Sequence, residues 1–302
     1  MKRLLSGIAA LLLLFGTTLA EAEYADTPGL AGPDLPPVSQ RLPVDPLIVK
    51  ENAPDDGPFG GTLMRSAADP RQDAGHYLCE GLFILGPDGK AAPNVARGYD
   101  VNADATVYTI RLREGMRWSD GQPFTAEDCV WFYNTVCLNR LDTKGVRKAY
   151  RSADGTPAAV ELVNSTTYSV TFSSPRPGFI EALAADPRGH YGPRHALGEV
   201  VQAVLDGDNA GALALCEARF GVSFADVVKM GKETLYYAWS CPGLPTLNAF
   251  VLDPAEGQKA MNNEGCTYLR NPWYWKVDPL GRQLPYADRL QYTRDMRPVA
   301  AP

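Results

Sequence analysis

The sequence predicts a mixed α/β fold, and three observations support this prediction. Tyr108, Ile110 and Leu112 alternate with polar residues, which is the period of a strand with one buried face. A turn and a capped helix start follow this strand directly. From Pro175 onward, apolar residues recur at helical spacing, which predicts helices over 179–185, 197–205 and 210–220.

Bulk composition indicates a globular protein that does not bind nucleic acid. The 302 residues are 45% hydrophobic, which is enough to bury a core. The formal net charge is −6, and Lys and Arg are dispersed along the chain. The densest basic grouping is typical of a solvated helix or loop face and consists of Lys144, Arg147, Lys148 and Arg151.

Residues 1–22 have the pattern of a cleavable signal peptide. Lys2 and Arg3 precede an apolar run from Leu4 to Phe15, and small residues end the segment at Ala22. The apolar run is too short to span a bilayer. No cysteine lies near the cleavage point, where a lipid anchor would attach. The mature chain is therefore predicted to be soluble and exported.

Residues 23–58 are predicted to be an extended leader. Repeated prolines between Pro28 and Pro54 interrupt any regular element. Ordered structure is expected to begin at Gly60, with a strand over 60–66 and an apolar helix over 76–83.

Two hairpins and a helix are predicted in the middle of the chain. Residues 96–101 pair with 107–113 across a four-residue turn, and residues 159–163 pair with 168–172. Both hairpins are expected to belong to one small mixed sheet. A helix of about four turns is expected to pack on it, because apolar residues recur at three- and four-residue spacing at Ala126, Val130, Tyr133, Cys137 and Leu141.

The start of that helix carries a capping box. Thr125 is placed to accept from the backbone N–H of Asp128, and the Asp128 carboxylate is placed to accept from that of Thr125. Asp120 lies in the preceding Ser-Asp-Gly turn, and Glu127 lies in the first helical turn. Turn geometry and capping thus account for all three carboxylates, which favours a scaffold over a catalytic acid pair.

Six cysteines occur in a chain that is expected to enter an oxidising space. One or two structural disulfides are therefore expected beside buried free thiols, among Cys79, Cys129, Cys137, Cys216, Cys241 and Cys266. Cys129 and Cys137 are too far apart along one helix to bond to each other. The chain has no C-x-x-C motif and only three histidines, so neither a metal nor a cofactor is predicted.

The segment 267–290 is the last recognisable unit. Strand alternation would place Trp273 and Trp275 on one face and Tyr274 on the other, and a packing role is preferred over a ligand platform. Arg-Asn-Pro-Trp-Tyr-Trp at 270–275 and Leu-Pro-Tyr-Ala-Asp at 284–288 resemble elements of a known family. Further matches in the expected order are Tyr-Leu-Cys-Glu-Gly-Leu at 77–82, the turn at Trp118, and Ser174-Pro175.

On these matches the chain resembles the extracytoplasmic solute-binding proteins of ABC transporters, family 5, of the oligopeptide-, dipeptide- and nickel-binding type. The resemblance implies a periplasmic location and a periplasmic binding protein type II-like α/β fold, in which two hinged lobes enclose a ligand. Residues 59–80 and 191–290 would form lobe I, and residues 81–190 a small mixed α/β domain attached to it. The second lobe is expected to be missing, with residues 291–302 forming a tail at the point where lobe II would begin.

The resemblance also implies where a ligand would bind. In this family the loop after the first strand lines the cleft, and its counterparts here are Ser66, Ala67, Ala68 and Asp69. Small side chains let a ligand backbone approach main-chain groups, which suits peptides with variable side chains. An ordinary βα loop explains these residues equally well. Tyr77, in the following helix, is a further candidate contact.

A second candidate surface is the aromatic loop 236–250, which resembles cleft-side loops in some relatives. Trp239 offers a large stacking area, and Asn248 offers both a donor and an acceptor. Core packing is the alternative role for both residues. A short Gly-x-Gly-Pro-Tyr turn that the family often shows is absent from this neighbourhood.

Three functions remain open from the sequence. The first is a non-catalytic periplasmic receptor that captures a peptide-like solute and delivers it to an ABC permease in the inner membrane. The second is a truncated or split-gene remnant of such a receptor, because a single lobe leaves much of a ligand solvated. The third, a secreted hydrolase, is disfavoured because neither Gly-x-Ser-x-Gly nor His-Glu-x-x-His occurs.

Overall fold

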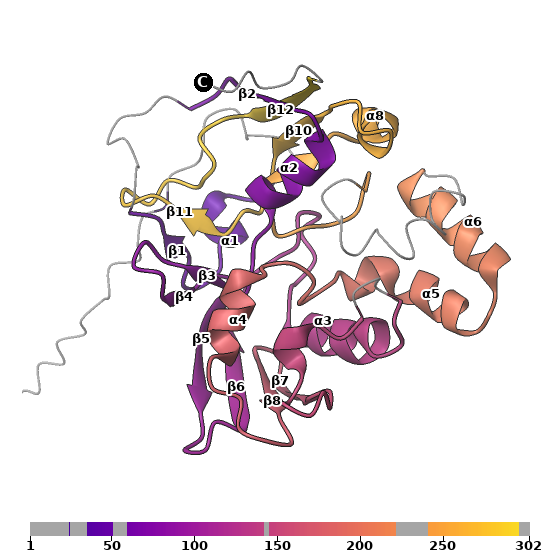
Figure 1. The fold of residues 1–302 in the computed structure, drawn as a ribbon. Coiled ribbons are helices and arrows are strands. Elements are labelled where there is room, and N and C mark those ends of the chain that lie inside the picture. The colour runs from indigo at the N-terminus through magenta and orange to yellow at the C-terminus, as the bar shows by residue number, and fades with distance from the viewer. Residues whose placement is uncertain (1–23, 25–34, 51–58, 142–144, 222–240, 296–302) are drawn as a thin grey trace, which may run out of the picture.

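Two four-stranded sheets organise the chain, and they lie toward opposite ends of the molecule in Figure 1. The structure is a computed structural model that describes residue 24 and residues 35–50, 59–141, 145–221 and 241–295. The predicted signal peptide, residues 1–22, lies outside the described residues. In the part of the chain that is described, no helix is long and apolar enough to cross a membrane.

The first sheet contains both predicted hairpins and is antiparallel throughout, in the order β5-β6-β8-β7. Its strands are β5 (Ala96–Val101), β6 (Val107–Leu112), β7 (Ala159–Asn164) and β8 (Thr167–Thr171). In β6 the burial of side chains alternates along the strand, with Tyr108, Ile110 and Leu112 buried. The predicted strand period and the pairing of the two hairpins are confirmed.

Helices cover the buried face of this sheet. α3 (Ala126–Trp131) continues as a π-helical turn over Phe132–Cys137, so the predicted four-turn helix changes its hydrogen-bonding pattern after one and a half turns. Its Tyr133 hydroxyl donates to the Ala158 carbonyl at 2.8 Å, which ties the helix to β7. α4 (Phe179–Ala185) packs on β6, with the Phe179 ring 5.0 Å from that of Tyr108.

The capping box at the start of α3 is present. The Asp128 carboxylate accepts from the Thr125 backbone N–H at 3.0 Å. The same carboxylate accepts from the Trp118 indole N–H at 3.2 Å and from the Arg194 backbone N–H at 3.2 Å. Asp128 therefore anchors the helix start, the preceding turn and the next helix at once.

The second sheet combines strands from both ends of the described chain, in the order β2-β12-β10-β9. Its strands are β2 (Thr62–Ala67), β9 (Phe250–Leu252), β10 (Thr267–Arg270) and β12 (Arg289–Arg294). β2 and β12 run parallel, and the other pairs are antiparallel. α2 (Pro70–Leu78) and α8 (Gly257–Met261) contribute Ala74, Leu78 and Ala260 to the core of this sheet.

The helix predicted over 76–83 begins and ends earlier, as α2. The Asp69 carboxylate caps its first turn, and Pro70 occupies the first helical position, where its missing N–H costs nothing. The chain is extended at Cys79, and Gly81 then lies so close to Pro187 that a Cβ at this glycine would lie 2.7 Å from the proline Cβ. The prediction placed this helix too late in the sequence, because it relied on apolar content alone.

The predicted extended leader contains ordered structure, which corrects that prediction. α1 (Val38–Arg41) buries Val38 and Leu42 against Val277, and β1 (Leu47–Ile48) pairs in parallel with β11 (Lys276–Val277). The buried Arg41 guanidinium donates to the Pro272 carbonyl at 2.6 Å. The prolines limit these elements to a few residues, but the segment still packs against the rest of the protein.

The remaining elements connect and flank the two sheets. β3 (Phe83–Leu85) pairs with β4 (Ala91–Pro93), and α5 (Arg194–Leu205) packs on α6 (Asn209–Phe220). Short 3-10 turns occupy Lys148–Tyr150 and Pro254–Glu256. The buried residues of α5 and α6 join the core of the first sheet, which also includes Leu244 and Trp275.

The aromatic run 273–275 lies in a turn, so the strand alternation predicted for it is wrong. The Asn271 side chain accepts from the Trp273 backbone N–H at 2.9 Å and bends the chain. As a result, Tyr274 and Trp275 are both buried, and Trp273 is partly buried.

The six cysteines are all free thiols, and the predicted disulfides do not form. Five of them are buried and distributed between the two cores, while Cys79 is partly buried. Burial raises the pKa of the Cys79 thiol to about 12 and that of Cys266 to about 11. These side chains therefore act as small apolar core residues.

A substitution at Gly121 tests the contact between the turn before α3 and the Trp273 ring. It adopts φ +84°, and a Cβ there would lie 2.8 Å from the Trp273 ring. Gly121→Ala is therefore expected to lower the unfolding free energy by about 2–4 kcal/mol, from left-handed strain plus steric overlap. Gly89→Ala is the matched control, since Gly89 has φ +74° and no neighbour within 4 Å. Denaturant melts that show equal losses for the two variants would contradict this contact.

Candidate functional site

The first candidate surface lies where the parallel strands β2 and β12 end. Ser66 pairs with Thr293, and Ala67 with Arg294, in the β2–β12 register. The Asp295 backbone N–H donates to the Ala67 carbonyl at 3.0 Å, which extends this pairing by one residue. Ser66, Ala68 and Asp69 are exposed and Ala67 is partly exposed, so the loop is open to solvent. The carboxyl ends of parallel strands are a common place for ligands in α/β folds.

Asp69 has a structural role in this loop. Its carboxylate accepts from the Gln72 backbone N–H at 2.9 Å and caps α2. The side chain is exposed, so the cap leaves a carboxylate oxygen facing solvent beside the loop. Asp69 can therefore both hold α2 and present a negative charge.

Replacing Asp69 separates these two roles. Asp69→Ala is expected to cost about 1 kcal/mol of stability through loss of the cap, while Asp69→Asn retains most of it, because asparagine caps helices as well as aspartate does. Thermal melts of the two variants measure the cap. A solute whose binding weakens in both variants uses the charge, and one whose binding is unchanged in Asp69→Asn does not.

Tyr77 lies on the exposed face of α2, with 48% of its surface accessible. The Arg65 guanidinium from β2 lies 4.5 Å from the centre of its ring. Arg65 also pairs with Asp73 at 3.2 Å, one helical turn before Tyr77. This contact fixes the guanidinium over one face of the ring and holds α2 to β2. Tyr77 thus remains an accessible aromatic surface beside the strand that carries Ser66.

Asn248 lies in a different place, between the two sheets. It is buried, its side-chain oxygen accepts from the Glu80 backbone N–H at 3.4 Å, and its carbonyl accepts from the Asn271 side chain at 2.8 Å. Asn248 also lines a cavity of about 50 Å³ together with Cys79, Trp118 and Tyr191. This cavity has room for only a few atoms. The hydrogen bonds of Asn248 give it a structural role, because they hold the loop 244–250 in place.

The structure therefore divides the predicted contacts into two groups. Ser66, Ala67, Ala68 and Asp69 lie at the start of α2, whereas Asn248 contacts Glu80 beyond its end. The nine residues of α2 separate them by about 13 Å along the helix axis. Trp239 lies outside the described residues.

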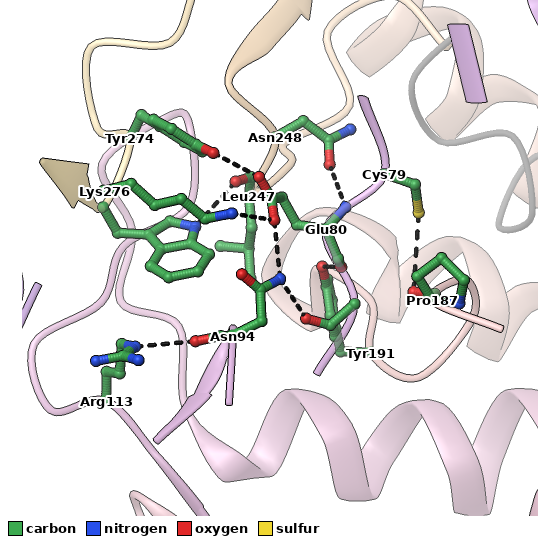
Figure 2. A network of polar contacts seen from close by, with 12 residues as sticks. Cys79, Glu80, Asn94, Arg113, Pro187, Tyr191, Leu247, Asn248, Tyr274 and Lys276 are labelled. Carbon is green, nitrogen blue, oxygen red and sulfur yellow. Dashed lines mark hydrogen bonds and ion pairs between the residues drawn. The ribbon is translucent and has the colours of Figure 1, made fainter. Parts of the chain in front are cut away.

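A polar network centred on Glu80 lies beside Asn248 and was not predicted (Figure 2). The Glu80 carboxylate accepts from the Lys276 ammonium at 2.8 Å, from the Asn94 amide at 2.8 Å and from the Tyr274 hydroxyl at 2.5 Å. Its backbone carbonyl accepts from the Tyr191 hydroxyl. Together with Asn248, which accepts from the Glu80 backbone N–H, four segments therefore meet at one residue, two positions after α2.

The carboxylate has little contact with solvent. The side chains of Glu80 and Lys276 are 11% and 12% exposed, so their ion pair is only weakly screened. Burial, then the nearby Glu80 charge, raises the pKa of the Tyr274 hydroxyl well above its ordinary value. Tyr274 is therefore a neutral donor at every physiological pH, which suits a structural hub.

Three polar side chains near the start of α3 make contacts between separate segments of the chain. Ser119 accepts from the Thr246 backbone N–H at 3.0 Å, Asp120 pairs with His195 at 2.8 Å, and Glu127 pairs with Arg194 at 3.3 Å. Each of these side chains holds two segments together. Within the described ranges, no group of three or more His, Cys, Asp or Glu residues is placed to hold a metal ion.

The buried His190 is expected to make the unfolding free energy depend on pH. Its Nε2 lies 2.5 Å from the Asp186 carbonyl, and burial together with the nearby Arg147 lowers its pKa from 6.5 to about 4. The neutral ring is favoured in the folded state. Its contribution is therefore complete above pH 6.5 and is lost as the pH falls toward 4.

The size of this loss is expected to reach roughly 3 kcal/mol. Melting temperatures of the wild type and of His190→Gln, measured between pH 7 and 4, test the prediction. The gap between the two should shrink on acidification, because glutamine cannot take up the proton. Parallel curves would show that His190 does not titrate in this range.

Comparison with known proteins shows that related chains are binding proteins. Residues 90–294 match the family model described as bacterial extracellular solute-binding proteins, family 5 Middle. The periplasmic alpha-galactoside-binding protein of Rhizobium meliloti (strain 1021) is 26% identical over 311 residues, covering 93% of this chain and 40% of that relative. The periplasmic oligopeptide-binding protein OppA of Escherichia coli (strain K12) is 33% identical over 126 residues, covering 38% of this chain and 23% of that relative.

Solved structures show the same fold relationship. An oligopeptide-binding protein OppA aligns with a TM-score of 0.71 and 26% identity, over 90% of this chain and 42% of that chain. The periplasmic binding protein MelB of Agrobacterium fabrum C58, solved in complex with stachyose, aligns with a TM-score of 0.64 and 22% identity, over 90% of this chain and 41% of that chain. This chain thus corresponds to part of a periplasmic binding protein fold, and it spans about 40% of the length of the alpha-galactoside-binding relative.

Proposed function

The chain belongs to the bacterial extracellular solute-binding proteins, family 5, and on this basis we propose that it serves as the solute-binding component of an ABC importer. In this role it captures peptide-like solutes outside the cytoplasm and delivers them to a membrane permease. The proposal includes export by the signal peptide 1–22 and no catalytic step. Residues 59–80 and 191–290 act as the first lobe and 81–190 as its attached domain, with α5 and α6 of the lobe packing into the core of that domain.

One observation carries the proposal at the level of the site. The end of β2 and the loop that follows it carry small side chains: Ser66 and Ala67 are the last two strand residues, where the sequence had predicted a loop, and Ala68 follows them. Ser66 and Ala68 are exposed, Ala67 is partly exposed, and the two parallel strands end here. Such a loop lets an extended ligand reach backbone groups without side-chain obstruction. The half-exposed Tyr77 ring of α2 adds an aromatic surface next to Arg65 of β2.

Asn248 and Trp239 remain proposed contacts of a second kind. The bonds of Asn248 to Glu80 and Asn271 support a loop of defined shape, against which a solute can rest. We assign this loop the role of a wall and the loop 66–69 the role of backbone recognition. No cofactor takes part.

An α-galactoside oligosaccharide is the second candidate solute. The relative that aligns with 93% of this chain is named for binding α-galactosides, whereas OppA of Escherichia coli aligns with 38%. An exposed tyrosine ring beside a guanidinium and a carboxylate, as at Tyr77, Arg65 and Asp73, also suits a sugar ring with its hydroxyl groups. The surface chemistry is compatible with both classes.

A thermal-shift screen tests the proposal and separates the two classes. Oligopeptide mixtures form one arm and α-galactosides such as stachyose the other. A solute present at 100 times its Kd should add about 2.7 kcal/mol to the unfolding free energy, which gives a shift of several degrees. Ala68→Arg should abolish the shift, because it fills the loop, while Ala153→Arg, in an exposed turn elsewhere, should not. No shift with either class would favour a remnant without a transport role.

A further inference from the structure

The cavity beside Asn248 lies where four segments of the chain meet. Its volume of about 50 Å³ is room for about three or four heavy atoms. Cys79 follows α2, Trp118 lies in the turn before α3, and residues of the segments 187–193 and 244–248 complete the lining. Most of the lining residues are apolar, so a polar group inside the cavity needs specific partners.

Asn248 presents an amide donor at this cavity. Only 6% of its surface is accessible, and its side-chain oxygen accepts from the Glu80 backbone N–H at 3.4 Å. That bond fixes the orientation of the amide, because an N–H requires an acceptor. The nitrogen Nδ2 therefore points away from Glu80 (Figure 2), and the contacts described for Asn248 do not engage it. A buried donor of this kind indicates a site for an acceptor.

Two carbonyl groups of the lining already accept hydrogen bonds. The Pro187 carbonyl accepts from the Cys79 thiol at 3.8 Å. The Leu247 carbonyl accepts from the Trp275 indole N–H at 3.1 Å. These acceptors are engaged within the protein, whereas the Nδ2 donor of Asn248 is not.

Thr246 and Arg188 add donors and charge to the lining. The Thr246 hydroxyl oxygen accepts from the Asn248 backbone N–H at 3.3 Å, so the hydroxyl hydrogen is available for donation. Among the described residues that line the cavity, Arg188 is the one with a charged side chain, and it pairs with Asp186 at 3.6 Å. The cavity therefore combines two neutral donors with a positive charge.

We propose that this cavity binds a carboxylate group, with Asn248 Nδ2 and the Thr246 hydroxyl as donors and Arg188 as the neighbouring cation. A carboxylate has three heavy atoms, which the volume accommodates. An ionised carboxylate accepts hydrogen bonds and donates none, so it matches a lining that offers donors. Hydrogen bonds to an ionised group are also the stronger kind.

This step rests on the proposed function and narrows its choice of solute. In a solute receptor the carboxylate belongs to the solute, either as the carboxyl end of a peptide or as an acidic side chain. A sugar hydroxyl has to donate as well as accept, and the Pro187 and Leu247 carbonyls are already engaged. The cavity therefore favours peptides over neutral α-galactosides.

Acetate is the probe that tests the site without any peptide. In a titration followed by ¹⁵N-resolved NMR, acetate is expected to shift the side-chain amide resonances of Asn248. These resonances are identified by their loss in Asn248→Asp, which keeps an acceptor for the Glu80 N–H. Acetamide, which has the same size and no charge, is expected to bind about tenfold more weakly, and sodium chloride controls for ionic strength.

A threonine variant tests the second donor. Thr246→Val keeps the shape of the side chain and removes the hydroxyl, so acetate is expected to bind about tenfold more weakly, as read from the same Asn248 resonances. Thr171→Val is the matched control, because Thr171 is exposed on β8, and it should bind acetate like the wild type. Unchanged backbone resonances elsewhere show that both variants fold.

Three peptides identify the source of the carboxylate. They are an alanine pentapeptide with a free carboxyl end, the same peptide as its terminal amide, and that amide with one glutamate. Tighter binding of the free acid assigns the site to the peptide terminus. Tighter binding of the glutamate-containing amide than of the plain amide assigns it to an acidic side chain.

The results that would overturn the proposal are separate from failure of the proposed function. No acetate-dependent shift at Asn248, or equal shifts with acetate and acetamide, would overturn the carboxylate site even if all three peptides bind. Equal affinities of the three peptides would overturn its role in holding the solute. Acetate binding at Asn248 without stabilisation by any solute would leave the carboxylate site in place and contradict the receptor function.

Discussion

Glu80→Ala is expected to destabilise the protein by about 3–5 kcal/mol, because it breaks a buried ion pair. The change leaves the Lys276 ammonium, which is 12% exposed, without its carboxylate partner. It also removes the acceptor of the Asn94 and Tyr274 donors. Chemical denaturation measures the loss, and tryptophan fluorescence reports it, because Trp275 packs within 4.9 Å of the Lys276 ammonium.

A double-mutant cycle identifies the cause. Lys276→Met alone removes the charge partner, and the combination with Glu80→Gln leaves neither charge behind. The double variant should be more stable than the sum of the two single losses predicts, because the cost arises from an unpaired buried charge. Strict additivity would mean that Glu80 and Lys276 do not interact energetically.

Trp118→Ala is expected to cost about 3–5 kcal/mol through loss of a buried aromatic side chain. Trp118 is 1% exposed, and its ring lies 5.3 Å from that of Phe124 and 5.9 Å from that of Tyr191. The change also removes the indole donor to Asp128. The unfolding midpoint in urea should fall sharply while the m-value stays constant.

Trp118→Phe is the matched control. Phenylalanine fills most of the volume but cannot donate to Asp128, so the expected loss is about 1–3 kcal/mol. Asp128 retains the backbone donors of Thr125 and Arg194 in this variant. A loss as large as that of Trp118→Ala would assign the whole effect to the hydrogen bond and contradict a packing role.

Local patterns predicted the first sheet well. The alternation at Tyr108, Ile110 and Leu112, the two hairpins and the helix over 179–185 all appear with nearly the expected bounds. These elements depend on side-chain period and turn residues, which a single sequence contains. The capping box at Thr125 and Asp128 could be predicted from the sequence for the same reason.

The errors arise where distant residues decide the structure. The leader is ordered because Val38 and Arg41 find partners at Val277 and Pro272, more than 200 residues away, and no local pattern reveals this. The six thiols are free, and the spacing of cysteines in the sequence does not show which of them the fold brings within bonding distance. The position of α2 had a local signal, Asp69 followed by Pro70, that the apolar pattern outweighed.

The candidate site was only partly accessible from sequence. The loop 66–69 could be named from the family resemblance, and the structure places it at the end of β2 in exposed positions. Glu80 could not be identified as a hub, because its partners Asn94, Tyr274 and Lys276 lie between 14 and 196 residues away. Single-sequence patterns do not encode such long-range contacts.

Hydrogen exchange of the purified chain, with and without a saturating solute from the peptide or α-galactoside class, tests the central claim most directly. Slower exchange is expected over residues 62–69 and at the α2 face around Tyr77 when the solute is bound, because backbone groups of the loop become engaged. Protection confined to other parts of the chain, or the absence of protection with every solute of both classes, would contradict it.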